Sequence, residues 1–144
     1  MIGGVTATTA YQNVVIPLLT MMDMLQYPYE LKRFEWKLYI KSLSGHQQTI
    51  IIQGINTREA EGKIKGLTLY SALLDEVCEL NYDGFKMLNS RLSLPGSFLL
   101  GTTNPSSPDH WVHKEYIDNK TLQITRHYKT IQTFYSSISN CKTM

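Results

Sequence analysis

Hydrophobic residues near the start of the chain recur at helical spacing. Between residues 11 and 25, apolar side chains return every three or four positions, which predicts a helix that is capped by Thr6, Thr8 or Thr9 and runs to about Gln26. Pro17 lies inside this segment and predicts a kink or a break, because proline cannot donate a backbone hydrogen bond. Residues 1–4, before the helix, have the pattern of the end of a strand and its turn.

The spacing then changes to that of strands. Residues 36–41 alternate between apolar and polar side chains, the pattern of a half-buried strand. A turn at residues 44–46 and an apolar run at 49–52 follow, so these segments predict a β-hairpin. Residues 54–66 form a polar connection with a short helical turn near 58–60. The apolar run at 67–74 predicts a strand at the centre of a parallel sheet.

The second half of the chain alternates helix and strand signals. The pattern predicts a helix over 81–92, a strand over 97–101, a helix over 107–117 and a last strand over 122–128. The tail from Thr130 is rich in serine and threonine, shows no period, and is predicted to be irregular. This alternation predicts an α/β fold with parallel crossovers.

Composition limits the classes of protein that this chain can represent. Its 144 residues suffice for one domain, and a net charge of +2 is too small to indicate nucleic-acid binding by itself. Cys78 and Cys141 form neither a disulfide framework nor a zinc-site spacing, which favours a reducing compartment. No apolar stretch approaches the ~20 residues of a membrane span, so we expect no membrane contact.

Polar residues follow two of the predicted strands. Asp75 and Glu76 end the run at 67–74, and residues 102–104, Thr-Thr-Asn, end the strand at 97–101. Ligands of α/β sheets bind beyond the carboxyl ends of the strands. P-loop ATPases with an additional glutamate use this arrangement: the first acid holds Mg²⁺, the second activates water, and a polar residue on the next strand senses the γ-phosphate. Acids also favour the first turn of a helix, and Thr-Asn-Pro is a common turn, but the pair in this order favours function.

Two longer segments carry a resemblance to a known family. Residues 66–77, GLTLYSALLDEV, resemble the Walker B segment of the large terminase subunits of tailed phages. Residues 101–111, GTTNPSSPDHW, resemble their coupling motif and the helix that follows it. Residues 2–6 and 13–17 are similar to the strand and helix after the Walker A helix of that family. The resemblance covers about residues 1–128.

The resemblance implies a fold and a set of roles. The fold would be an incomplete P-loop NTPase-like domain of the class with an additional catalytic glutamate, with a mainly parallel sheet and flanking helices. Asp75 would be the Mg²⁺ acid and Glu76 the catalytic base. Thr103 and Asn104, with Thr102 beside them, would couple hydrolysis to movement. Arg91 would either face a neighbouring subunit's nucleotide or point into solvent as an ordinary helix residue.

The resemblance also implies cofactors, partners and a location. The full-length family protein would use ATP and Mg²⁺ to move viral DNA into the prohead, and would carry a nuclease domain. Its partners would be double-stranded DNA, the portal protein, the small terminase subunit and further copies of itself in a ring. The expected location is the cytoplasm of the bacterial host.

The sequence departs from the family pattern at the phosphate loop. No G-x-x-x-x-G-K-[ST] motif occurs, so the β- and γ-phosphates lose most of their anchoring, and we expect weak ATP binding and no useful hydrolysis by this chain. We therefore expect residues 1–128 to be a partial terminase ATPase domain and 129–144 an irregular, frameshifted tail. Two alternatives remain: an intact small Mg²⁺-dependent phosphoryl-transfer domain using Asp75 and Glu76, or a non-catalytic interaction module.

Two other groupings have simpler explanations. His110 and His113 are close enough on a predicted helix to share a metal, but no third ligand is nearby, which favours packing or capping. Cys78 follows the acids without an adjacent base, so we do not expect it to act as a nucleophile.

Overall fold

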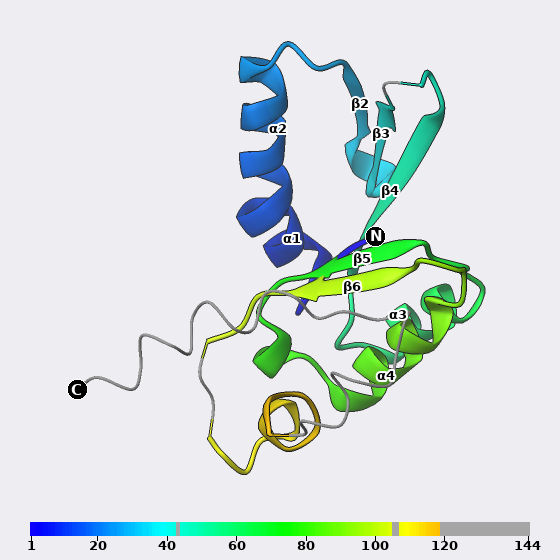
Figure 1. Cartoon of the computed structure of the whole chain (residues 1–144). Coiled ribbons are helices and arrows are strands. Elements are labelled where there is room, and N and C mark those ends of the chain that lie inside the picture. Colours follow the sequence, from blue (N-terminus) through cyan, green and yellow to red (C-terminus); the bar gives the residue numbers. More distant parts are fainter. Residues whose placement is uncertain (43, 105–106, 119–144) are drawn as a thin grey trace.

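The chain forms a six-stranded mixed sheet with the strand order β2-β3-β4-β1-β5-β6 (Figure 1). The computed structural model describes residues 1–42, 44–104 and 107–118. Four strands pair in parallel: β1 (Ile2–Gly4), β4 (Gln47–Gly54), β5 (Ser71–Leu74) and β6 (Phe98–Gly101). The strands β2 (Tyr29–Lys32) and β3 (Lys37–Lys41) extend the sheet in antiparallel fashion. The predicted α/β class with a mainly parallel sheet is confirmed.

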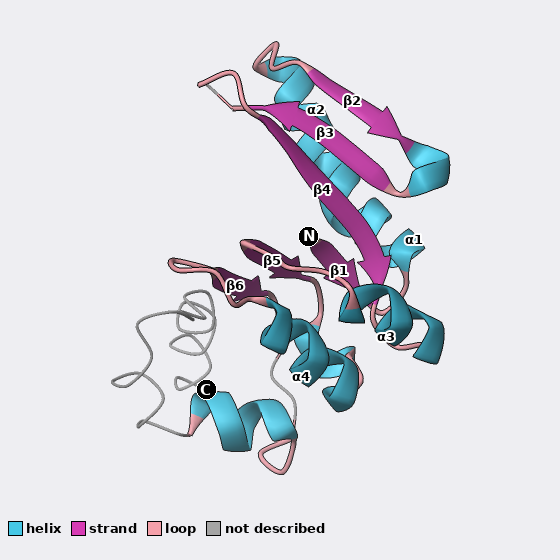
Figure 2. Ribbon diagram, turned by 90° about the vertical axis from the view of Figure 1, so that its right-hand side faces the viewer, coloured by secondary structure: helices cyan, strands magenta, loops and turns pink. Residues whose placement is uncertain are grey.

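Helices cover the two faces of the parallel strands separately (Figures 1 and 2). One face receives α1 (Ala7–Ala10), η1 (Tyr11–Val15) and α2 (Ile16–Met24), and the other receives α3 (Arg58–Lys65) and α4 (Tyr82–Arg91). Alternation along the strands divides the core accordingly. Ile2 and Ile52 pack with the α1 side, whereas Ala72, Leu74 and Leu99 pack with the α3 and α4 side.

The first helical segment is continuous but changes its geometry in the middle. Thr6 begins it with a capping box shared with Thr9, as the threonine cap predicts. Instead of a break at Pro17, the turn widens into the π-helical segment η1, where the N–H of Ile16 donates to the carbonyl of Tyr11. The wider turn accommodates the missing N–H of Pro17, so the chain passes the proline without ending the helix.

The hairpin differs from the prediction at its edges. The pairing of β3 with β4 is confirmed, but β4 is longer than the predicted 49–52. Tyr29, which the sequence analysis assigned to no strand, begins β2. Trp36 is not in a strand, because its φ of 54° places it in the left-handed region after η2 (Arg33–Glu35), so β3 begins one residue later. Tyr29 opposes Ile40 across the additional strand pair.

The later elements match more closely. The helix α4 and the strand β6 confirm the predictions over 81–92 and 97–101, and α3 extends the short turn expected near 58–60 to eight residues. The strand predicted over 67–74 is only half as long. The N–H of Leu69 donates at 2.9 Å to the carbonyl of Arg91, so the backbone before β5 pairs with the end of α4 rather than with a strand.

The helix predicted from residue 107 begins later. Ser107 does cap a turn, accepting from the N–H of Asp109 at 3.3 Å, but the helix starts at Trp111 and continues as η4 (His113–Ile117). The predicted strand over 122–128 and the irregular tail lie outside the described residues. Within the described part of the chain, no helix is long and apolar enough to cross a membrane.

Candidate functional site

The ends of β5 and β6 lie side by side and are joined by hydrogen bonds. Leu74 pairs with Gly101 at the last position of the two parallel strands. The N–H of Thr102 donates to the carbonyl of Leu74 at 2.9 Å, and the N–H of Val77 donates to the carbonyl of Thr102 at 2.8 Å. The predicted proximity of the acidic turn and the Thr-Thr-Asn turn is confirmed.

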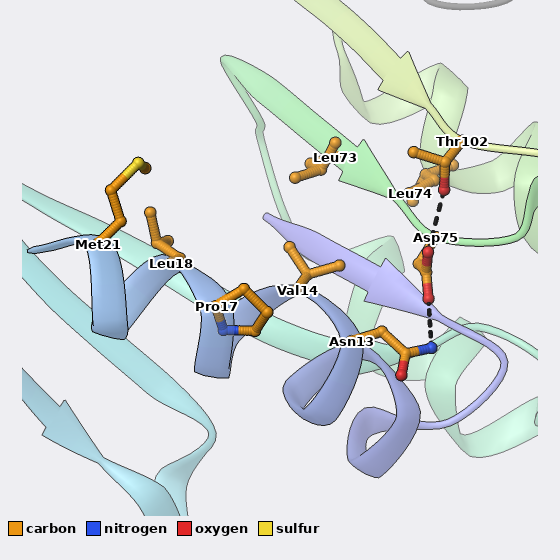
Figure 3. Close-up of a pocket in the computed structure, with 9 residues that line it drawn as sticks. All are labelled: Asn13, Val14, Pro17, Leu18, Met21, Leu73, Leu74, Asp75 and Thr102. Carbon is orange, nitrogen blue, oxygen red and sulfur yellow. Dashed lines mark hydrogen bonds between the residues drawn. The ribbon is translucent and has the colours of Figure 1, made fainter. Parts of the chain in front are cut away.

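The Asp75 carboxylate is held by two neutral donors (Figure 3). The Thr102 hydroxyl donates to Oδ1 at 3.0 Å, and the side-chain amide of Asn13 donates to Oδ2 at 2.8 Å. The Asp75 N–H also donates to the carbonyl of Gly3 on β1 at 2.9 Å. Each carboxylate oxygen accepts one side-chain hydrogen bond and keeps further lone pairs, so Asp75 can still bind a cation or water.

Glu76 has an unusual backbone conformation. Its φ of 51° and ψ of 58° are left-handed, a region that non-glycine residues seldom occupy and that costs on the order of 1–3 kcal/mol. The Glu76 N–H donates to the Thr102 hydroxyl oxygen at 3.3 Å, and its carbonyl accepts from the N–H of Glu79 at 2.8 Å. The turn is therefore stabilised by the neighbouring strand end, while the Glu76 side chain is exposed.

Thr103 and Asn104 contact the segment after the acids, through Cys78. The Cys78 N–H donates to the Thr103 hydroxyl oxygen at 3.2 Å, and that hydroxyl lies 2.7 Å from the Cys78 sulfur. The Cys78 thiol in turn donates to the carbonyl of Asn104 at 3.4 Å. Cys78 therefore links the two turns, a contact that the sequence analysis did not anticipate. The groups that these bonds bring to the thiol are a hydroxyl and a carbonyl, neither of which is a general base.

The acids line two different grooves. The first groove, of about 450 Å³, contains Asp75 and Thr102 and is otherwise largely apolar. It lies between α2 and the ends of β5 and β6 (Figure 3). The second, of about 430 Å³, contains Glu76, Thr103 and Asn104. The predicted site residues thus lie together at one sheet edge but open into two separate grooves, because consecutive residues project in different directions from the turn.

Asn13 is the functional candidate that the sequence analysis missed. It lies 62 positions before Asp75, so no local pattern connects the two residues. The available signal was Pro17, whose ring obstructs the carbonyl four residues earlier, that of Asn13. A proline inside a helical pattern therefore indicated a change of geometry at the residue that contacts the acid.

The described residues fit a magnesium ion better than they fit the ATP that would bind together with it. They contain no group of three or more His, Cys, Asp or Glu side chains that could hold a metal. Mg²⁺ does not require such a cage, because it commonly uses one or two carboxylates together with waters and substrate phosphates. Asp75, with the Thr102 hydroxyl beside it, meets this requirement. The lysine-containing phosphate loop has no counterpart in the sequence.

His110 and His113 form no metal site in the described region. His110 Nδ1 accepts from the N–H of Val112 at 3.3 Å, so it terminates the turn before the helix. His113 Nε2 is buried without a hydrogen-bond partner among the described atoms. The packing and capping role expected for the pair agrees with these positions.

Arg91 lies at the other end of the sheet. Its guanidinium Nη1 donates to the carbonyl of Lys65, the last residue of α3, at 3.1 Å. Its own carbonyl accepts from Leu69, before β5, whereas Asp75 follows β5. Arg91 therefore caps a neighbouring helix, and neither of the two positions considered from the sequence describes it fully.

The parallel strands with flanking helices, and polar turns at the ends of β5 and β6, define a partial domain of the P-loop NTPase-like class. Comparison with known proteins identifies the family. The family model described as phage terminase large subunit matches residues 29–138, most of the chain, and the chain belongs to that family.

Solved structures agree with this assignment. The large terminase of a thermophilic bacteriophage is 25% identical over 90% of this chain, with a TM-score of 0.80. The same terminase in complex with ADP gives a TM-score of 0.77, and in complex with ATP-γ-S a TM-score of 0.74. The chain spans 31% of the length of the first of these structures. No curated protein sequence matches it.

Proposed function

We propose that this chain forms the part of a large terminase ATPase domain that carries the magnesium acid, the catalytic base and the coupling turn. The observation that carries the proposal is the hydrogen-bonded junction of the β5 and β6 ends, which brings Asp75, Glu76 and residues 102–104 together. Membership of the terminase family supports it. The ADP and ATP-γ-S complexes of the thermophilic phage terminase are consistent with nucleotide use by the family.

The site residues divide into two units in this proposal. Asp75 binds Mg²⁺ with the Thr102 hydroxyl beside it, in the groove that both line. Glu76 is the base that takes a proton from the attacking water, and it shares the second groove with Thr103 and Asn104, the coupling residues. ATP supplies the phosphoryl group that is transferred. Because the Thr102 hydroxyl bonds to the Asp75 carboxylate and to the Glu76 N–H, a displacement of either acid would be transmitted to the 102–104 turn.

The activity of the whole protein is part of the same proposal. The full-length terminase would hydrolyse ATP to move double-stranded viral DNA into the prohead. It would work in the cytoplasm of the bacterial host, with the portal protein, the small terminase subunit and further copies of itself. These partners follow from the family alone.

The first test concerns the isolated chain. We expect the 144-residue protein to hydrolyse Mg²⁺·ATP no faster than its Glu76→Gln variant, because the sequence contains no phosphate loop to anchor the nucleotide. The measurement is phosphate release under single-turnover and steady-state conditions. A metal-dependent turnover that Glu76→Gln abolishes would instead support an intact small phosphoryl-transfer domain.

A second test restores the missing phosphate loop. Residues 1–118 replace the matching segment of the thermophilic phage terminase, whose fold this chain shares. We expect ATP hydrolysis by this chimera and its loss in Glu76→Gln, with Glu59→Gln as the matched control, since Glu59 is an exposed acid of α3 that lines neither groove. A folded chimera whose hydrolysis survives Glu76→Gln would refute the assignment of the base.

A further inference from the structure

Asn13, in η1, contacts Asp75, the candidate Mg²⁺-binding residue, although it lies outside the two polar turns that form the proposed site. Its side-chain amide donates to Asp75 Oδ2 at 2.8 Å, and the Thr102 hydroxyl donates to Oδ1 at 3.0 Å (Figure 3). The two donors come from opposite sides, one from η1 and one from the turn after β6. Because both oxygens are engaged, rotation of the carboxylate about its Cβ–Cγ bond would break at least one hydrogen bond.

The chemical nature of the donors matches a metal ligand. An amide and a hydroxyl are neutral, so they orient the carboxylate without neutralising its charge. A lysine or arginine at the same place would compete with a cation. Among the described side chains, no lysine, arginine or histidine lies within 4.0 Å of the Asp75 carboxylate. Of the residues that the structure describes, Asp75 is also the only acid that lines the first groove.

The backbone around Asn13 is adapted to this contact. Pro17 provides no N–H for the Asn13 carbonyl, and its ring obstructs that carbonyl. The helix responds with the wider π turn of η1, which closes when the N–H of Ile16 reaches the carbonyl of Tyr11. Single π turns inside α-helices are rare and often occur at functional sites. The β1 strand connects the two parts, since Gly3 bonds to the Asp75 N–H shortly before the chain enters the helix.

We propose that Asn13 is a positioning residue for Asp75, which holds the carboxylate in the orientation that binds the divalent cation. The inference rests on the proposed function, because it takes Asp75 as the magnesium acid. It assigns Asn13 no contact with the nucleotide. Residues that orient a metal ligand through a hydrogen bond typically change metal affinity by tenfold or more when they are removed.

Mn²⁺ binding tests the inference without requiring hydrolysis. Nuclear magnetic resonance spectra of the ¹⁵N-labelled 144-residue chain are recorded during a Mn²⁺ titration, and paramagnetic broadening of the Asp75 and Thr102 signals reports occupancy. We expect Asn13→Ala to raise the Mn²⁺ concentration for half-maximal broadening about tenfold. The matched control is Gln12→Ala, which removes the neighbouring exposed amide of η1 and should leave that concentration unchanged.

A second variant, which should strengthen Mn²⁺ binding instead of weakening it, distinguishes the positioning role from a purely structural effect. Asn13→Asp places a second carboxylate beside Asp75, so Mn²⁺ should bind more tightly while the metal-free chain becomes less stable to urea, through like-charge repulsion. Mn²⁺ should restore part of that stability. A role limited to packing would lower stability in Asn13→Ala without weakening its Mn²⁺ binding.

Asp75→Asn separates failure of this inference from failure of the proposed function. If Asp75→Asn abolishes the broadening but Asn13→Ala behaves like Gln12→Ala, Asn13 is not a positioning residue and the metal role of Asp75 stands. If the wild-type chain shows no broadening at Asp75, or if Asp75→Asn leaves it intact, the metal role fails and the inference falls with it. Loss in Asp75→Asn together with a tenfold weakening in Asn13→Ala supports both.

Discussion

Two helical glycines in this protein should respond in opposite ways to the same substitution. Gly84 lies in the first turn of α4, where an added Cβ would be 2.7 Å from the carbonyl oxygen of Ile55 and 2.8 Å from its Cγ2. Gly62 lies in α3 and is exposed, and an added Cβ would have no atom within 4 Å apart from its chain neighbours and the nearby backbone of its own helix. Alanine is favoured over glycine inside a helix by about 1 kcal/mol in both places. The surroundings therefore decide the sign of the effect.

The contact at Gly84 should outweigh the helix propensity. The atom in the way is backbone, and Ile55 cannot easily move, because its N–H donates to the carbonyl of Gly4 at 2.9 Å and its side chain is buried. Forcing a methyl group into such a position typically costs about 1–3 kcal/mol, and a contact this short against backbone lies at the upper end of that range. Less about 1 kcal/mol from propensity, Gly84→Ala should lower the free energy of unfolding by about 2 kcal/mol.

Urea denaturation followed by tryptophan fluorescence measures both variants. Trp111 is a suitable reporter, since its ring centroid lies 4.8 Å from that of Phe85 on α4. Gly62→Ala should raise the urea midpoint by the equivalent of ~0.5–1 kcal/mol, and Gly84→Ala should lower it, with similar slopes. A stabilised Gly84→Ala variant would show that α4 does not approach Ile55 as closely as the structure has it, and would refute the reasoning.

Two further predictions concern stability. In a chain with a free Met1 amino group, burial lowers the pKa of that amine from 8.0 to about 6, while it donates to the carbonyl of Ser71 at 2.8 Å. The unfolded chain then binds the proton more tightly than the folded chain, so the free energy of unfolding should be greatest above pH 8. It should fall by on the order of 2 kcal/mol between pH 8 and 6, and this group should cause no further change at lower pH. Urea midpoints across this pH range would measure the effect, and a flat profile would contradict it. Asn81→Ala should cost about 1 kcal/mol, because the Asn81 side chain caps α4 by accepting from the N–H groups of Asp83 and Gly84, whereas Asn81→Asp should retain most of the cap; equal losses in the two variants would exclude capping as the cause.

Much of the fold was predictable because its signals are local. The threonine cap of the first helix, the helix α4 and the hairpin of β3 with β4 depend on residues a few positions apart, and the structure contains all three. The failures have physical causes of longer range. Only the second half of the strand predicted over 67–74 forms, because the N–H of Leu69 bonds to the backbone of α4 instead. Tyr29 belongs to a strand because it pairs with the edge of β3.

The candidate site was predictable only in part. The position of the acids and of the Thr-Thr-Asn turn at the ends of two apolar segments placed them at one edge of the sheet, because parallel strands direct their carboxyl ends to the same side. The sequence could not show that Asp75 and Glu76 line separate grooves, since this depends on the left-handed backbone of Glu76. Nor could it show that Arg91 caps α3 at the far end of the sheet.

The sequence by itself determined the order of most helices and strands, β2 excepted, and the chemical character of the turns, because periodicity, caps and turn residues act over a few positions. The tertiary structure decided the strand order β2-β3-β4-β1-β5-β6, and with it the insertion of β1 between β4 and β5. That insertion brings the helix after β1 alongside the acidic turn and allows Asn13 to reach Asp75. A contact between residues so distant in the chain depends on the packing of the whole sheet, which no local pattern encodes.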